Sequence, residues 1–183
     1  MVIAGLNISN ALCNLLNVVF IALGNAVGIL IGQQLGAGQT EQVKKNAFRL
    51  MRFTGGVSAG LTVLLIAISH VFPKLYNTTE DVRQYAAMFI IITALFFPVQ
   101  GYLNALYFTL RSGGKTLVTF LFDSVYSWVV IVPIAKVLCE YTGLPILMIY
   151  AIVHAADIIK VAIGYALIRK GVWISNLAEE IKM

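Results

Sequence analysis

Residues 8–35 are the most informative stretch of the chain, with the sequence ISNALCNLLNVVFIALGNAVGILIGQQL. None of these residues is acidic or basic. A helix needs about 20 predominantly apolar residues to cross the hydrocarbon core of a bilayer. The stretch is longer than that, and it therefore predicts a membrane-spanning helix.

The composition of the whole chain is that of a membrane protein. Of its 183 residues, 60% are hydrophobic and 11% are charged, whereas a soluble domain carries about 25% charged residues. The mean hydropathy is +0.88. These values exclude a water-soluble globular domain and a nucleic-acid-binding module. The net charge of +5 is therefore assigned to basic cytoplasmic loops, with no nucleic-acid partner.

Four more apolar segments follow the first, each long enough to cross a bilayer. The five predicted spans cover residues 8–35, 53–72, 85–110, 117–138 and 145–168, and short polar connections join them. We predict an all-α fold, a polytopic bundle of five transmembrane helices embedded in the lipid bilayer. The bundle is expected to be a single transmembrane domain covering residues 1–183.

Basic residues are distributed unequally between the two sides of these spans. Lysine and arginine are retained in cytoplasmic loops, so the richer side is predicted to be cytoplasmic. This predicts a multi-pass protein of the plasma membrane with its amino terminus outside and its carboxyl terminus in the cytoplasm. The basic residues on the richer side are Lys44, Lys45, Arg49, Arg52, Arg111, Lys115, Arg169, Lys170 and Lys182.

One helical face of the first span collects asparagine and glycine. Polar groups in a span are costly and tend to face another helix or a water-filled cavity. Asn10, Asn14 and Asn17 on this face either hydrogen-bond to another helix or line a polar cavity. Glycine every fourth residue lets helix backbones approach closely. The glycines to which we assign helix packing, including a pair in the second span, are Gly24, Gly28, Gly32, Gly36, Gly56 and Gly60.

The third span carries Pro98 near its middle, followed by Gln100 and Asn104 one turn apart on the same face. Proline removes one backbone hydrogen bond and favours a kink. A bent helix beside two amide side chains at mid-membrane is typical of a substrate path. A packed kink whose amides are satisfied by hydrogen bonds is the alternative.

The fourth and fifth spans contain ionisable side chains. Asp123 is expected to be neutral, hydrogen-bonded to serines, or paired with a nearby base such as Arg111 or Lys115. In the fifth span His154 and Asp157 share a face, and Lys160 lies at its edge one turn after Asp157. A pair between Asp157 and Lys160 would lower the cost of insertion. Such a pair is either structural or part of a proton- or cation-linked site.

The motifs of enzymes are missing from the sequence. Gly114-Lys115-Thr116 matches the end of a phosphate-binding loop, but Thr109 stands where that loop requires glycine. The two histidines and two cysteines lie at different depths, without the spacing of metal ligands. We expect no enzymatic activity, no metal site and no cofactor.

Several motifs resemble the MATE (multidrug and toxic compound extrusion) family of transporters. Residues 31–38, IGQQLGAG, resemble the cytoplasmic end of its eighth helix, and residues 110–116, LRSGGKT, resemble its connection between helices ten and eleven. Their order and spacing cover essentially the whole chain. The residues that fit the eleventh helix, the twelfth helix and the tail are Asp123, Trp128, Pro133, Asp157, Lys160, Trp173, Asn176 and Leu177.

The resemblance implies helices eight to twelve of an antiporter with two six-helix lobes. Members exchange Na⁺ or H⁺ for small organic, often cationic, compounds by alternating access. On this expectation the amino-terminal lobe and helix seven are missing partners, and the chain is inactive alone. The implied substrate-cavity residues are Asn10, Asn14, Asn17, Gln100 and Asn104. The intramembrane charges, with a coupling or a structural role, are Asp123, His154, Asp157 and Lys160.

Two alternative functions are compatible with the sequence. A related flippase or exporter of lipid-linked or polysaccharide substrates shares the broader architecture, but it would favour a more cationic cavity than one intramembrane base, Lys160, provides. A non-transporting membrane assembly subunit could be built on the glycine faces.

Overall fold

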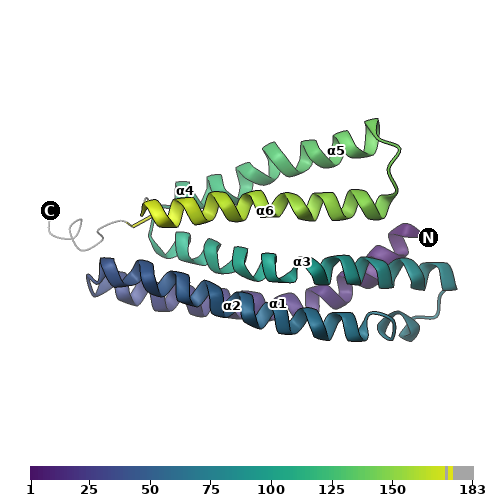
Figure 1. Ribbon diagram of the computed structural model, residues 1–183, viewed down its shortest axis with the longest axis horizontal. Helices are drawn as coiled ribbons and strands as arrows, with labels where there is room; N and C mark the ends of the chain where they lie inside the picture. Colours follow the sequence, from purple (N-terminus) through teal and green to yellow (C-terminus); the bar gives the residue numbers. More distant parts are fainter. Residues whose placement is uncertain (172, 175–183) are drawn as a thin grey trace.

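The computed structural model describes residues 1–171 and 173–174, which fold into a bundle of long helices (Figure 1). Five helical stretches are long and apolar enough to cross a membrane, and no strand occurs in the described part of the chain. The predicted all-α class with five spanning helices is confirmed. Asn176, Leu177 and Lys182, which the sequence analysis singled out, lie outside the described residues.

The helices follow one another with short connections. The fourth span, Leu117–Tyr141, is a continuous stretch in which two π-helical segments separate α4 from α5. The elements in chain order are α1 (Val2–Gly36), α2 (Thr40–Ile68), the 3-10 helix η1 (Phe72–Leu75), α3 (Glu80–Ser112), α4 (Thr116–Phe120), the π-helical segments η2 (Leu121–Val125) and η3 (Ser127–Ile131), α5 (Val132–Tyr141) and α6 (Ile146–Lys170).

The second helix differs most from its predicted span. It begins at Thr40, well before residue 53, because the basic stretch between them is amphipathic and helical. Val43, Ala47 and Met51 recur every fourth residue and are fully buried on one face. Hydropathy identified the apolar part of the helix and missed this polar extension. At the other end the helix stops at Ile68, before residue 72.

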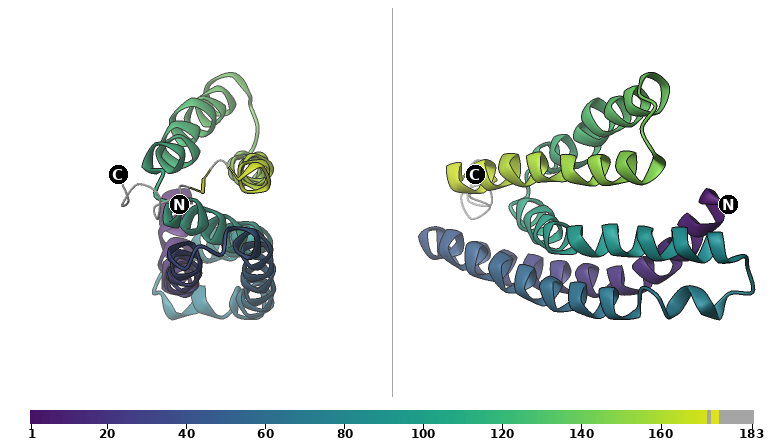
Figure 2. Two further views of the ribbon diagram at one scale, coloured as in Figure 1. Left: turned by 90° about the vertical axis from the view of Figure 1, so that its left-hand side faces the viewer. Right: turned by 45° about the vertical axis from the view of Figure 1, so that its right-hand side comes forward.

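The third helix is the centre of the bundle. It packs against α1, α2, α4 and α6, and half of its most apolar stretch is buried, compared with 11% for α6. Figure 2 shows α1 and α2 on one side of α3, and α4, α5 and α6 on the other side. The helix runs through Pro98 without interruption.

The apolar core is divided along the bundle. One cluster fills the half where α1 joins α2 and where α6 ends, and it includes Phe122, Ile168 and Trp173. A second cluster, with Phe20, Leu65 and Phe97 among its members, fills the other half. In the first cluster Trp173 is fully buried, and an antiparallel bridge joins Ile174 to Gly114. The segment after α6 is therefore attached to the connection between α3 and α4.

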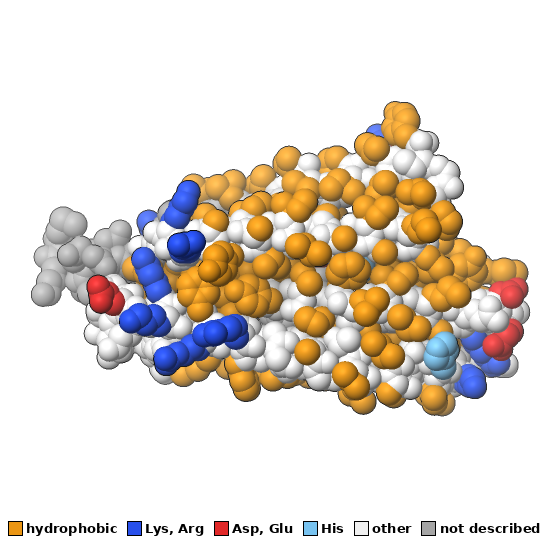
Figure 3. Space-filling view, viewed as in Figure 1, with side chains coloured by type: hydrophobic (Ala, Val, Ile, Leu, Met, Phe, Trp, Pro, Cys, Tyr) orange, Lys and Arg blue, Asp and Glu red, His pale blue; other side chains and the backbone are white. Residues whose placement is uncertain are grey.

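The outer surface suits a lipid environment. Large apolar side chains such as Leu15, Val63 and Trp128 are mostly exposed. Figure 3 shows hydrophobic side chains over the length of the bundle and charged side chains gathered at its two ends, with Lys and Arg at the end where α1 meets α2. In lipid, exposed apolar side chains along the middle of a helix carry no penalty.

Candidate functional site

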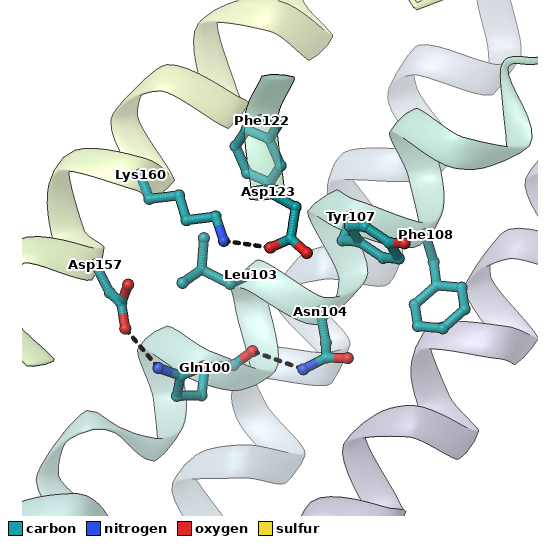
Figure 4. A pocket seen from close by; sticks show the side chains of 9 residues that line it. All are labelled: Gln100, Leu103, Asn104, Tyr107, Phe108, Phe122, Asp123, Asp157 and Lys160. Atoms are coloured by element: carbon teal, nitrogen blue, oxygen red, sulfur yellow. Dashed lines mark hydrogen bonds and ion pairs between the residues drawn. The ribbon is translucent and has the colours of Figure 1, made fainter. Parts of the chain in front are cut away.

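A pocket of about 330 Å³ lies between α3, η2 and α6 (Figure 4). Five residues singled out by the sequence converge here, although they come from three segments of the chain. The full lining is Gln100, Leu103, Asn104, Tyr107, Phe108, Phe122, Asp123, Asp157 and Lys160. The pocket therefore unites the amide pair of α3 with three of the four predicted intramembrane charges.

The ammonium of Lys160 is held by one carboxylate and two aromatic rings. Its Nζ donates to Oδ1 of Asp123 over 2.6 Å. It also lies 5.3 Å from the ring centre of Phe122 and 5.8 Å from that of Tyr126, within the range in which a ring face attracts a cation. The Lys160 side chain is only 12% exposed, whereas that of Asp123 is 50% exposed.

This ion pair corrects the partner expected for each of its two residues. Lys160 was expected to pair with Asp157 one turn earlier, which is wrong, because its ammonium bonds to Asp123 across 37 residues of sequence. Asp123 was expected to be neutral, hydrogen-bonded to serines, or paired with a nearby base such as Arg111 or Lys115. It is paired with a base, but that base is Lys160. The long lysine side chain reaches from α6 to η2 (Figure 4), a tertiary contact that helical spacing cannot reveal.

Asp157 is attached to α3 instead. Its Oδ2 accepts a hydrogen bond of 2.7 Å from Nε2 of Gln100, and the backbone carbonyl of Gln100 accepts a longer bond of 3.4 Å from Nδ2 of Asn104. Asp157 and Lys160 therefore connect α6 to two different neighbours. Asp157 has a neutral amide as its partner, and Lys160 has a carboxylate.

The segment that carries Asp123 is wider than an α-helix. The backbone N–H of Tyr126 donates to the carbonyl of Leu121, five residues earlier, as in a π-helix. The hydroxyl of Tyr126 donates to the carbonyl of Ala156 on α6 over 2.6 Å. Single π-helical turns inside helices are frequent at functional sites. Here the wide turn is attached to α6 by both Tyr126 and Asp123.

His154 lies outside the pocket, in an aromatic cluster between α3 and α6. Its ring stacks on Phe96 with centroids 5.6 Å apart and meets Tyr150 edge-on at 4.6 Å. The hydroxyl of Tyr150 is hydrogen-bonded to that of Thr93 over 2.9 Å. This environment gives His154 a packing contact between the two helices.

The asparagines of α1 are separate from the pocket. Asn10, Asn14 and Asn17 are exposed, and none of the three lines the pocket. Within the described residues their side chains make no hydrogen bond. The predicted substrate-cavity set is therefore split between Gln100 and Asn104, which line the pocket, and an exposed face of α1.

The six glycines assigned to packing also separate into two groups. A Cβ at Gly24 would collide with the ring of Phe108, and one at Gly28 would touch the same side chain at 3.6 Å. At Gly32, Gly36, Gly56 and Gly60 a Cβ would meet no described atom within 4 Å.

Two glycines that were not assigned to packing also approach their neighbours closely. A Cβ on Gly101 would overlap Ser58, and one on Gly164 would lie 2.8 Å from the ring of Phe122. Phe122 and Tyr126, the two rings beside Lys160, were not selected from the sequence. The signal that could have found them is the presence of aromatic residues within one turn of an intramembrane acid.

The fold, the apolar surface and the charges inside the bundle define a multi-pass α-helical membrane protein. The MatE family model matches residues 1–137, about three quarters of the chain, and the chain belongs to this family of MATE proteins. The predicted resemblance is thereby confirmed.

The chain is also similar to a curated bacterial protein. The chain is 26% identical over 163 residues to the "Probable multidrug resistance protein YoeA" of Bacillus subtilis (strain 168). The match covers 88% of this chain and 35% of the relative, so the chain spans about a third of that protein's length. No solved structure matches the chain at a significant level.

Proposed function

We propose that the chain is the helix eight to twelve part of an antiporter that exports organic, often cationic, compounds in exchange for Na⁺ or H⁺. The observation that carries this proposal is Asp157, a carboxylate near the middle of α6 that faces a polar pocket and has a neutral amide as its partner. Family membership and the name of the Bacillus relative support export of drugs.

The charge of the pocket favours a cation. It holds two carboxylates, Asp123 and Asp157, and one ammonium, Lys160. With all three ionised, one negative charge is uncompensated. Ionisable groups inside a membrane mark ion and substrate pathways, and a carboxylate whose hydrogen-bond partner is a neutral amide can accept either Na⁺ or a proton. Asp157 is therefore the proposed coupling residue, and a flippase with a strongly cationic cavity is disfavoured.

The remaining surfaces suit a larger assembly. We propose that an amino-terminal lobe and helix seven complete the transporter, with the exposed asparagine face of α1 turned toward the cavity between the lobes. The four glycines without near neighbours would be contact positions for those elements. The amino terminus is proposed to lie outside and the basic end, where α1 meets α2, in the cytoplasm.

A chimera tests the proposal. In the Bacillus relative, the segment that matches this chain is replaced by residues 1–183, and the chimera is produced in an efflux-deficient bacterium. Export of ethidium is measured in membrane vesicles under an imposed Na⁺ or H⁺ gradient. We expect gradient-dependent export that falls at least about tenfold in Asp157→Asn, equivalent to about 1.4 kcal/mol.

Glu140→Gln is the matched control, because it removes an exposed carboxylate outside the pocket. We expect it to export at the unmodified rate. Unchanged gradient dependence in Asp157→Asn would give Asp157 a structural role. A membrane-inserted chimera that exports nothing under either gradient would refute transport and favour the assembly subunit.

A further inference from the structure

The groups around the ammonium of Lys160 form a cage of the kind that recognises organic ammonium ions. Phe122, Asp123 and Tyr126 come from a single wide turn, and they supply a carboxylate 2.6 Å from Nζ and two ring centres within 6 Å of it. Aromatic faces combined with a carboxylate attract alkylated ammonium groups, which are weakly hydrated. Hard metal cations prefer a shell made of oxygen ligands.

The cage is open to the pocket although its present occupant is nearly enclosed. Asp123 is 50% exposed and Lys160 12% exposed. The same carboxylate also borders a second pocket of about 220 Å³, whose lining includes Tyr107, Phe120 and the basic residue Arg111. A ligand can therefore approach Asp123 from two directions while Lys160 occupies the cage.

A displaced Lys160 would have a second carboxylate to bind. Asp157 lies three residues earlier on the same helix and lines the same pocket, and its partner is the neutral amide of Gln100. Positions three apart on a helix are neighbours. The ammonium can therefore leave Asp123 for Asp157 without being left unpaired.

The walls of the cage are held independently of the lysine. Phe122 is buried, and it packs over Gly164, where a Cβ would come within 2.8 Å of its ring. Tyr126 is fixed by its hydroxyl bond to the carbonyl of Ala156. Removal of the lysine side chain leaves both of these contacts in place, so an empty cage would keep its shape.

We propose that Phe122, Asp123 and Tyr126 form a binding site for an organic ammonium ion, which Lys160 occupies as a tethered competitor, and that an exported cation binds by displacing Lys160 toward Asp157. This inference rests on the proposed export function. It specifies which side chains bind the exported cation and which carboxylate receives the displaced Lys160. Lys160 is then a specificity-determining residue, because only cations that bind the cage better than a tethered ammonium can enter.

The test measures binding, without transport, on the 183-residue chain in lipid nanodiscs. The probe is ethidium, followed by fluorescence polarisation, with tetramethylammonium as a competitor. We expect Lys160→Met to bind ethidium about tenfold more tightly, because a competitor that fills the site in about nine molecules of ten weakens the apparent affinity by that factor. Asp123→Asn is expected to lose binding, and Phe122→Leu to weaken it about fivefold.

Two further variants test why Lys160→Met would bind ethidium more tightly. The double variant Asp123→Asn/Lys160→Met should bind no better than Asp123→Asn. Lys136→Met, which removes the exposed lysine paired with Glu140, should leave the affinity unchanged. Circular dichroism and size-exclusion chromatography confirm folding, and Phe122→Leu tests the cage with its charges intact if Lys160→Met does not fold.

Several outcomes would overturn the inference. A folded Lys160→Met chain that binds ethidium no better than the unmodified chain excludes competition by the lysine. A gain that persists in the double variant excludes Asp123 as the site, and unchanged binding in Phe122→Leu excludes the cage. Binding that follows the expected pattern in a chain whose chimera exports nothing would refute the proposed function and leave the ammonium site intact.

Discussion

The two sides of α3 are joined to their neighbours by different kinds of contact. Toward α1 and α2, backbones approach closely, as Gly24 does under Phe108 and Gly101 beside Ser58. Hydroxyl groups there bond mostly within their own helix, as Ser58 does to the carbonyl of Thr54. Toward α6, ring contacts such as Phe96 with His154 are combined with bonds between polar side chains, of which Gln100 to Asp157 is the central example.

This difference indicates which contacts between helices can rearrange. In lipid, helices associate through close packing and hydrogen bonds, because burial of apolar surface gains little. Interlocked side chains allow one arrangement only, since packed interiors resist deformation. Polar groups can exchange one partner for another at small cost. The side toward α1 and α2 is thus suited to be a rigid body, and the α6 side is suited to rearrange.

The largest loss of stability is expected when a side chain is added on the side of α3 that faces α1 and α2. Gly101→Val would push a side chain into Ser58, with the carbonyl of Thr54 directly behind it. We expect a loss of about 3 kcal/mol in the free energy of unfolding, as for other overpacked cores. The measurement is unfolding by SDS in mixed micelles, followed by circular dichroism.

Gly60→Val is the matched control for Gly101→Val. It adds the same side chain inside a helix, at a position where no described atom lies within 4 Å. We expect a change within about 0.5 kcal/mol, as at other surface positions. Equal losses in the two variants would show that glycine spacing, and not contact, governs stability on this side.

A smaller effect is expected for the central polar bond on the α6 side. Gln100→Leu removes the donor to Asp157 and should cost about 1.5 kcal/mol, the usual value for a hydrogen bond to a charged group. The same unfolding assay applies, with Gln84→Leu on the exposed face of α3 as control. If the losses from Gln100→Leu and Asp157→Asn add fully in the double variant, the bond contributes nothing.

The hydroxyl of Tyr126 should contribute slightly less. Tyr126→Phe keeps the ring near Lys160 but removes the bond to the carbonyl of Ala156. We expect a loss of about 1 kcal/mol in the unfolding assay, typical of a neutral hydrogen bond. Tyr141→Phe removes a hydroxyl from a side chain that is largely exposed, and it should change nothing. A similar small loss in both variants would refute the attachment of the wide turn to α6.

The smallest change in stability is expected for the ion pair between Lys136 and Glu140 on α5. Lys136 and Glu140 lie 4.0 Å apart with both side chains more than half exposed. Lys136→Met should change the free energy of unfolding by less than about 0.5 kcal/mol, because exposed ion pairs contribute little. A loss above 1 kcal/mol would mean that charge alone, independent of burial, stabilises the α5–α6 side.

The elements of the fold were predictable from sequence, and most of their contacts were not. Apolar segments of sufficient length predicted the five helices because lipid imposes length and hydropathy on any helix that crosses it. The start of α2 at Thr40 was missed, since hydropathy does not register an amphipathic extension. Glycine spacing predicted the approach at Gly24 but missed Gly101 and Gly164, because each of these is the single glycine of its helix and belongs to no repeat.

Several residues of the candidate site could be selected from the sequence, but their convergence and their bonds could not. The cost of insertion singles out polar residues in a span, and it therefore selected Gln100, Asp123 and Asp157. The structure places these three residues in one pocket, which was not predicted. Helical spacing then favoured the wrong partner for Lys160, because a near neighbour on one helix competes with groups that only folding brings close. Tyr126 was not selected, because an aromatic residue in a span does not carry the insertion cost of a charged one.

The pairing of Asp123 with Lys160 also bears on how the chain is made. The ribosome adds about 5–20 residues per second, so the 37 positions that separate the two residues correspond to roughly 2–7 seconds of synthesis. During that interval an aspartate whose insertion alone costs about 3 kcal/mol has been made without its lysine. The fourth and fifth spans are therefore expected to leave the translocon together as a helical hairpin.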